Sequence, residues 1–102
     1  MITATQAKEL TNQTIRLKEI KAEEVAESEL PHIQERILEA AKTGIYGISY
    51  GWTLIYLAEK KVDATIFLNA IEQLLLYQGF DIAKECNLHK AIVYIKWENA
   101  ND

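Results

Sequence analysis

The residue types best suited to chemistry lie near the end of the chain, where two residues separate Cys86 from His89. This spacing suits two ligands of one metal ion, and Glu85 could add a carboxylate oxygen. A structural zinc site usually needs four ligands, however, and the only other histidine is the distant His32. A Cys–His nucleophile pair would need a third orienting group and an oxyanion site. We therefore expect neither a metal nor a cofactor.

The carboxylates and glycines do not suggest a reaction either. Asp63 precedes a helical pattern and is interpreted as a helix cap, and Asp81 is placed on the exposed face of a strand. The glycines at 47 and 51 alternate within an apparent strand and do not match a phosphate-binding loop. We therefore predict that the protein is not an enzyme.

Aromatic side chains form a second group with binding potential. Tyr and Trp combine a large apolar area with a polar handle, which suits interfaces and ring-stacking sites. A structural core is the favoured interpretation, because a small sheet needs bulky residues on its covered face. Arg16, Lys18 and Lys21 of the N-terminal segment could contact a nucleotide, or could simply keep that segment hydrated. The candidate binding surface consists of Tyr46, Tyr50, Trp52, Tyr56, Tyr94, Arg16 and Lys18.

Composition and charge narrow the class of protein. A chain of 102 residues with a net charge of −4 is expected to form one domain over residues 1–102. The weak acidic charge argues against nucleic acid and membrane partners, because phosphate contacts need clustered Lys and Arg. No apolar run approaches the ~20 residues that span a bilayer, and the start of the chain does not resemble a signal peptide. With one cysteine, we expect a soluble cytoplasmic protein.

The elements that position these residues begin with a long helical pattern over residues 1–43. Thr3 and Gln6 match a capping box at its start, and Gly44 suits the left-handed stop just beyond its end. Pro31 is the one interruption, and it implies either a kink or a restart of the helix capped by Ser28.

The length of this helix predicts an oligomer. Residues 4–29 alone would extend ~39 Å at about 1.5 Å per residue. A compact globule of this chain length is only about 33 Å across. We therefore expect the helix to pack against a second copy of the chain, through Leu10, Leu17 and Ile20. The alternative is a sharp bend at Pro31 that folds the helix back on itself.

Five glutamates lie close together in the middle of the helix. Pairs of like charge at i,i+4 are mildly destabilising, and a solvated helix face is the simplest interpretation. The alternative is an acidic contact surface for a basic partner, and the sequence does not select it. The five are Glu19, Glu23, Glu24, Glu27 and Glu29.

The remainder, residues 44–98, has the pattern of strands and one helix, and residues 99–102 form a polar tail. Between 45 and 52 one strand face would be bulky and the other almost bare, and a Gly51-Trp52 hairpin turn is slightly favoured. A helix follows Asp63, and alternation then predicts strands over 80–86 and 91–97, with Cys86 on a buried face. The fold class is α+β, with a long N-terminal helix, a small and mostly antiparallel sheet, and one packing helix.

Several segments resemble a loose group of small accessory or early proteins of tailed bacteriophages. The similar segments are an opening "ITA…A" helix, "EAAKTGIYGISY", "LLLYQGFDIAKE" and a final strand closing in Ile95-Lys96-Trp97. The resemblance implies a viral origin and residence in the host cytoplasm. It also implies that the protein binds a host component or assists virion assembly.

Together these observations predict a non-enzymatic, homo-oligomeric protein that binds or inhibits a host macromolecule. Two alternatives remain open: a sponge that holds a small nucleotide signal between protomers, and a minor virion or assembly factor.

Overall fold

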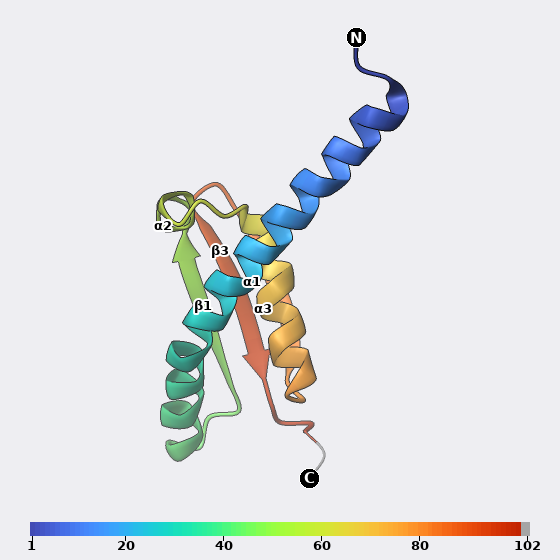
Figure 1. Cartoon of the computed structure of the whole chain (residues 1–102). Helices are drawn as coiled ribbons and strands as arrows, with labels where there is room; N and C mark the ends of the chain where they lie inside the picture. Colours follow the sequence, from blue (N-terminus) through green and yellow to red (C-terminus); the bar gives the residue numbers. More distant parts are fainter. Residues whose placement is uncertain (101–102) are drawn as a thin grey trace.

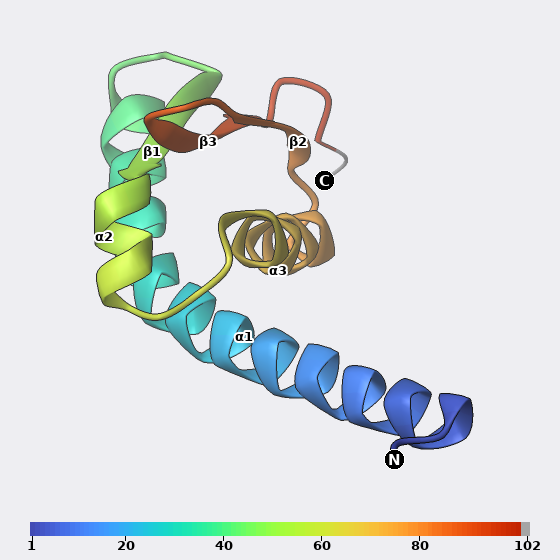
Figure 2. The ribbon, with the colours of Figure 1, turned by 90° about the horizontal axis from the view of Figure 1, so that it is seen from above.

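A computed structural model describes residues 1–100 of the chain. Three helices and three strands are arranged in two layers, and Figures 1 and 2 show the helices on one side of the sheet. The sheet is antiparallel with the order β1-β3-β2, so the last strand is central. The fold is therefore α+β, as the sequence predicts. The elements are α1 (Ala4–Lys42), β1 (Gly47–Thr53), α2 (Leu54–Glu59), α3 (Ala64–Tyr77), β2 (Asp81–Cys86) and β3 (Lys90–Lys96).

Helix α1 begins and ends where the local signals predict. The Thr3 hydroxyl accepts a hydrogen bond from the Gln6 backbone N–H at 3.2 Å, and the Gln6 side chain accepts one from the Thr3 N–H at 3.0 Å. At the other end, Gly44 has a φ of 85°. The helix continues through Pro31 without a restart. Ser28 does not cap a new helix, since its hydroxyl donates to the Val25 carbonyl of the preceding turn at 2.6 Å. Figures 1 and 2 show the helix changing direction along its second half, as expected for a proline kink.

The core lies between the sheet and the helices. Alternate residues of β3 are buried against the helices, and so is Trp52 of β1. From the helix side, α1 and α3 contribute most of the large buried side chains. Phe67, Ile33, Leu57, Ile71, Leu75, Ile95 and Val93 are the largest that are fully buried.

The expected hairpin at Gly51-Trp52 is wrong. Strand β1 continues through both residues and pairs with β3 along its whole length, with Gly51 opposite Ile92. The chain then enters α2, because the Thr53 hydroxyl accepts the Tyr56 N–H at 3.1 Å and so caps a helix. The bare strand face is confirmed, since Gly51 and its alternate neighbours lie on the side of the sheet away from the helices.

The expected burial of Cys86 is also wrong. Cys86 is exposed at the end of β2, an edge strand of the sheet. Two residues earlier, the Lys84 ammonium reaches α3 and bonds to Asn69 and, at 3.0 Å, to Glu72. The helix-facing side of β2 is therefore polar at this end, where the alternation pattern predicted a buried Cys86. A charged side chain at this place also discourages further strand pairing at the edge.

The first half of α1 projects beyond the rest of the protein. The structure measures 62 × 30 × 21 Å, with a radius of gyration of 16.3 Å. Figure 1 shows the blue end of α1 leaving the two layers and carrying the N-terminus away from them. We call residues 4–21 the arm, and none of its side chains is buried. In the described part of the chain, no helix is long and apolar enough to cross a membrane.

Candidate functional site

One side of the arm, together with its cap residue Thr3, carries a row of exposed leucine, alanine and threonine side chains. Thr3, Ala7, Leu10, Thr14 and Leu17 follow one another at alternating steps of four and three residues. This spacing keeps them on one side of a helix, as in a coiled-coil seam. Leu10 is 55% exposed and Leu17 is 68% exposed. We call these five residues the outer stripe.

The outer stripe faces away from the side of the arm that looks toward α3. At about 100° per residue, Leu10 and Leu17 lie about 150° around the helix from Ile15. Ile20 borders the outer stripe and is 38% exposed. The three predicted oligomer residues are therefore available on the arm, on a side that the rest of the protein leaves uncovered.

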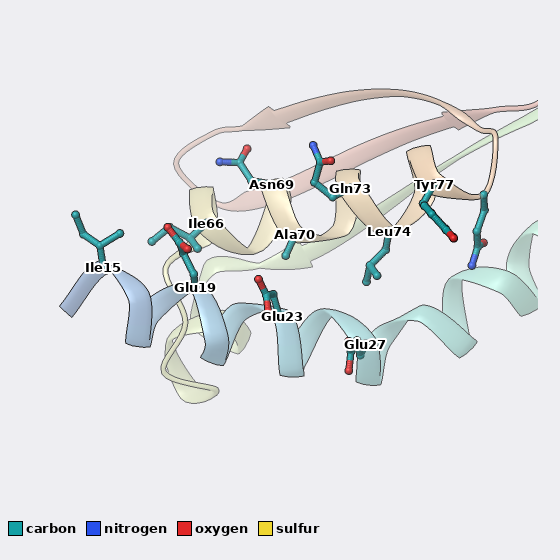
Figure 3. Close-up of a pocket in the computed structure, with 11 residues that line it drawn as sticks. Ile15, Glu19, Glu23, Glu27, Ile66, Asn69, Ala70, Gln73, Leu74 and Tyr77 are labelled. Carbon is teal, nitrogen blue, oxygen red and sulfur yellow. The ribbon is translucent and has the colours of Figure 1, made fainter. Parts of the chain in front are cut away.

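A groove of about 640 Å³ runs between α1 and α3. Figure 3 shows Ile15, Glu19 and Glu23 pointing from α1 toward α3, with Ala70 and Leu74 pointing back from α3. Half-buried apolar side chains of α3 form its floor, and Asn69, Gln73, Tyr77 and Gln78 contribute to its polar rim. The groove therefore has the composition of a helix-binding surface, with an apolar centre and a polar border.

The groove is acidic. Glu19, Glu23 and Glu27 line its α1 side at successive four-residue steps, and none of its lining residues is Lys, Arg or His. Arg16 lies 3.8 Å from Glu19, in a pair whose side chains are largely exposed, and such pairs contribute little. Within residues 1–100, no ion pair or side-chain hydrogen bond engages Glu23 or Glu27. Glu19 and Glu23 thus direct their carboxylates toward the groove with almost no neutralising charge, and Glu27 lines its edge.

The five clustered glutamates have different environments. Glu19, Glu23 and Glu27 share the groove, and Glu24 is exposed elsewhere on the helix. Glu29 is only 7% exposed and lies among the core residues of α1. The i,i+4 spacing of the first three was the one sequence signal that could have grouped them.

Glu29 joins α1 to α2 through a tyrosine. The Tyr56 hydroxyl donates a hydrogen bond to the Glu29 carboxylate, and this bond raises the pKa of Tyr56 to about 12. Burial raises the pKa of the neighbouring Tyr50, and the charge of Glu29 raises it further. This cluster is satisfied inside the protein, so we interpret it as structural.

The residues of the candidate binding surface do not form one surface. Trp52 is 5% exposed, and its buried indole N–H has no hydrogen-bond partner in the described part of the chain. Tyr50 packs beside Trp52 with ring centroids 4.9 Å apart. Arg16 and Lys18 lie on the arm, separated from the end of α1 near Tyr46 by ~35 Å of helix at about 1.5 Å per residue.

Tyr94 lies apart from these rings, on the face of the sheet that no helix covers. Its hydroxyl donates to the Glu85 carboxylate at 3.0 Å, which raises the pKa of Tyr94. The alternate residues of β1 on this face, Gly47, Ser49 and Gly51, are small, so the surface beside Tyr94 is shallow. The structure shows no second aromatic ring of the candidate set beside it.

Cys86 and His89 lie in and next to the turn between β2 and β3. Asn87 organises this turn, because its side-chain oxygen accepts the N–H groups of His89 at 2.8 Å and Lys90 at 2.9 Å. Among residues 1–100, no group of three or more His, Cys, Asp or Glu side chains is placed to hold a metal ion.

The groove and the outer stripe, on opposite sides of the arm, are therefore the two surfaces with the most apparent capacity to bind a partner. No family model, curated protein or solved structure matches this chain.

Proposed function

We propose that this chain is a non-enzymatic binding protein whose groove between α1 and α3 holds an amphipathic helix with basic side chains. The observation that carries the proposal is the alignment of Glu19, Glu23 and Glu27 beside the apolar floor formed by Ala70 and Leu74.

The apolar floor and the acidic wall select different features of a ligand. An apolar helix face seated over Ala70 and Leu74 removes hydrocarbon from water, which provides most of the binding free energy. Basic side chains beside that face would meet the glutamates, which favours one orientation and accelerates association. A neutral or acidic helix of the same shape would leave three carboxylates facing a surface without cations.

We also propose that this binding takes place in a bacterial host cell. This part of the proposal rests on the resemblance to phage accessory proteins. On that basis, the ligand helix would belong to a host macromolecule, and occupancy of the groove would inhibit it.

The test measures binding of a fluorescein-labelled peptide of ~20 residues, with leucines at three- and four-residue steps and lysines beside them. Fluorescence anisotropy gives the dissociation constant for the unmodified protein and for the variant E19Q/E23Q/E27Q. We expect the triple variant to bind about tenfold more weakly, because each charge contact contributes up to about 1 kcal/mol near a surface.

The matched control is E35Q/E39Q/E59Q, which changes the same total charge at three exposed glutamates outside the groove. It should bind the peptide as the unmodified protein does. A second peptide with glutamates in place of the lysines should bind poorly to all three proteins. Equal weakening in the groove variant and the control would reduce the effect to net charge and contradict the proposal.

A further inference from the structure

We propose that the helix held in the groove is the arm of a second copy of this chain, so that two copies exchange arms reciprocally. The inference rests on the proposed function of the groove and names its occupant in the free protein, where a host helix would have to displace the arm. It would also account for the exposure of Leu10, Leu17 and Ile20, which are 55%, 68% and 38% exposed in one copy.

The charges of the arm and the groove are complementary. The arm carries four basic and two acidic side chains, a net charge of +2, although the whole chain has −4. Lys18 lies four residues after Thr14, and Lys21 lies four residues after Leu17. Residues four apart are neighbours on a helix surface, so both lysines lie next to the outer stripe. The groove has three glutamates and no cation. The arm therefore has the chemistry that the groove selects, with leucines in the centre and lysines beside them.

The lengths also agree. The groove follows α1 from Ile15 to Glu27, about 18 Å at 1.5 Å per residue, and the arm is about 27 Å long. Ala7 and Thr14 in the outer stripe and Ala70 in the floor are small, so the helix backbones can approach closely. The arm can thus span the whole groove of another copy.

The two binding surfaces lie on opposite sides of the same arm, which permits both contacts at once. The inner side of each arm completes its own groove, through Ile15 and Glu19, while the outer stripe enters the groove of the partner. Under a two-fold axis both exchanges are equivalent, as in an isologous dimer. The result is a closed pair, since neither copy retains an unfilled groove.

A partner would also stabilise the helical conformation of the arm. An isolated helix of this length is marginal in water, and tertiary packing normally provides its stability. No side chain of residues 4–21 is buried in the single copy. Burial of the outer stripe in a second copy would supply that packing.

The experiment uses two charge-reversed full-length proteins, K18E/K21E in the arm and E23K/E27K in the groove. All four positions are exposed in the single copy, so both variants should fold. Light scattering behind size exclusion measures the mass of each protein alone and of an equimolar mixture. A monomer has 11.7 kDa. The variant E35K/E39K reverses the same number of charges on α1 outside the groove and is the matched control.

We expect the unmodified protein and the control to have twice the monomer mass. Each charge-reversed variant alone should dissociate at least about tenfold more easily, because its arm and groove then carry the same sign. The mixture should recover the dimer, since the acidic arm fits the basic groove and the basic arm fits the acidic groove. This recovery separates arm exchange from any simple loss of folding.

Three outcomes would overturn the inference. An E23K/E27K dimer that dissociates no more easily than the unmodified dimer would mean that the arms pair with each other and leave the grooves empty. A mixture that stays monomeric would show that the two surfaces do not meet. An unmodified protein that is monomeric at about 100 μM would exclude the second copy, and if it still bound the lysine peptide, the proposed function of the groove would stand.

Discussion

The buried carboxylate of Glu29 gives a sharp prediction about stability. In the described part of the chain, the Tyr56 hydroxyl is the one donor that bonds to it, and Glu29 is 7% exposed. The substitution Tyr56→Phe keeps the aromatic ring in place and removes this donor alone. The carboxylate would then remain in the interior without a hydrogen bond.

The size of the effect follows from the burial of the acceptor. A hydrogen bond to a charged group contributes about 1.5–3 kcal/mol, and an unsatisfied buried carboxylate pays the full desolvation cost. We therefore expect Tyr56→Phe to lower the free energy of unfolding by about 2 kcal/mol. For a chain of this length that loss lowers the Tm by about 10 °C.

The assay compares thermal unfolding, followed by circular dichroism at one protein concentration, for Tyr56→Phe and Tyr94→Phe. Tyr94 donates an equivalent hydrogen bond to Glu85, but both side chains are exposed, so its loss should change stability by less than about 0.5 kcal/mol. Equal losses in the two variants would refute the argument from burial.

The same bond predicts a dependence on alkaline pH. The folded-state pKa of Tyr56, about 12, lies above its ordinary value of 10.0, so between these values the folded protein holds a proton that the unfolded chain has released. This contribution to stability is complete below pH 10 and is lost as the pH rises toward 12. In Tyr56→Phe this part of the alkaline loss should be absent.

Two further substitutions test the C-terminal end and the kink of α1, and a third, in β1, serves as a comparison. Gly44→Ala should lower the free energy of unfolding by about 1–2 kcal/mol in urea denaturation, because Gly44 has a φ of 85° that alanine adopts only with strain. Gly51→Ala, whose added Cβ would make an ordinary contact of 3.4 Å with Ile92, should cost less, and the reverse order would contradict this reasoning. Pro31→Ala should raise the Tm, since proline inside a helix is about 3 kcal/mol less favourable than alanine. A lower Tm would show that the kink itself is required for packing.

Structural features that depend on a few neighbouring residues were predictable from the sequence. Thr3 with Gln6, and Asp63 with its helix, form the caps expected of them, because capping depends on side-chain oxygens within three residues of the backbone they bind. The position of Gly44 after α1 was predictable for the same reason.

Features decided by distant partners were not predictable. Gly51 and Trp52 resemble a hairpin turn locally, but β3 offers a partner along the whole of β1 and the chain continues straight through. The alternation of β2 predicted a buried Cys86, whereas its position at the end of an edge strand leaves it exposed. Neither outcome is visible without knowing which strand is central.

The groove shows the same limit for the candidate site. The sequence contained both of its walls, the glutamates of α1 and the apolar face of α3, but about forty residues separate them in the chain. A solvated acidic face was the simplest interpretation of Glu19, Glu23 and Glu27 until α3 was placed beside them.

The capping box at Thr3 and Gln6 lies at the far end of the arm, beyond any contact with the rest of the protein. A cap in that place has little effect on the global unfolding of the domain. It sets instead the fraction of time for which the free arm is helical, and an apparent affinity falls in proportion to the fraction of binding-competent molecules. Thr3 would thus tune the affinity for the partner. Its replacement would weaken association but leave the Tm of the sheet and the helices packed on it unchanged.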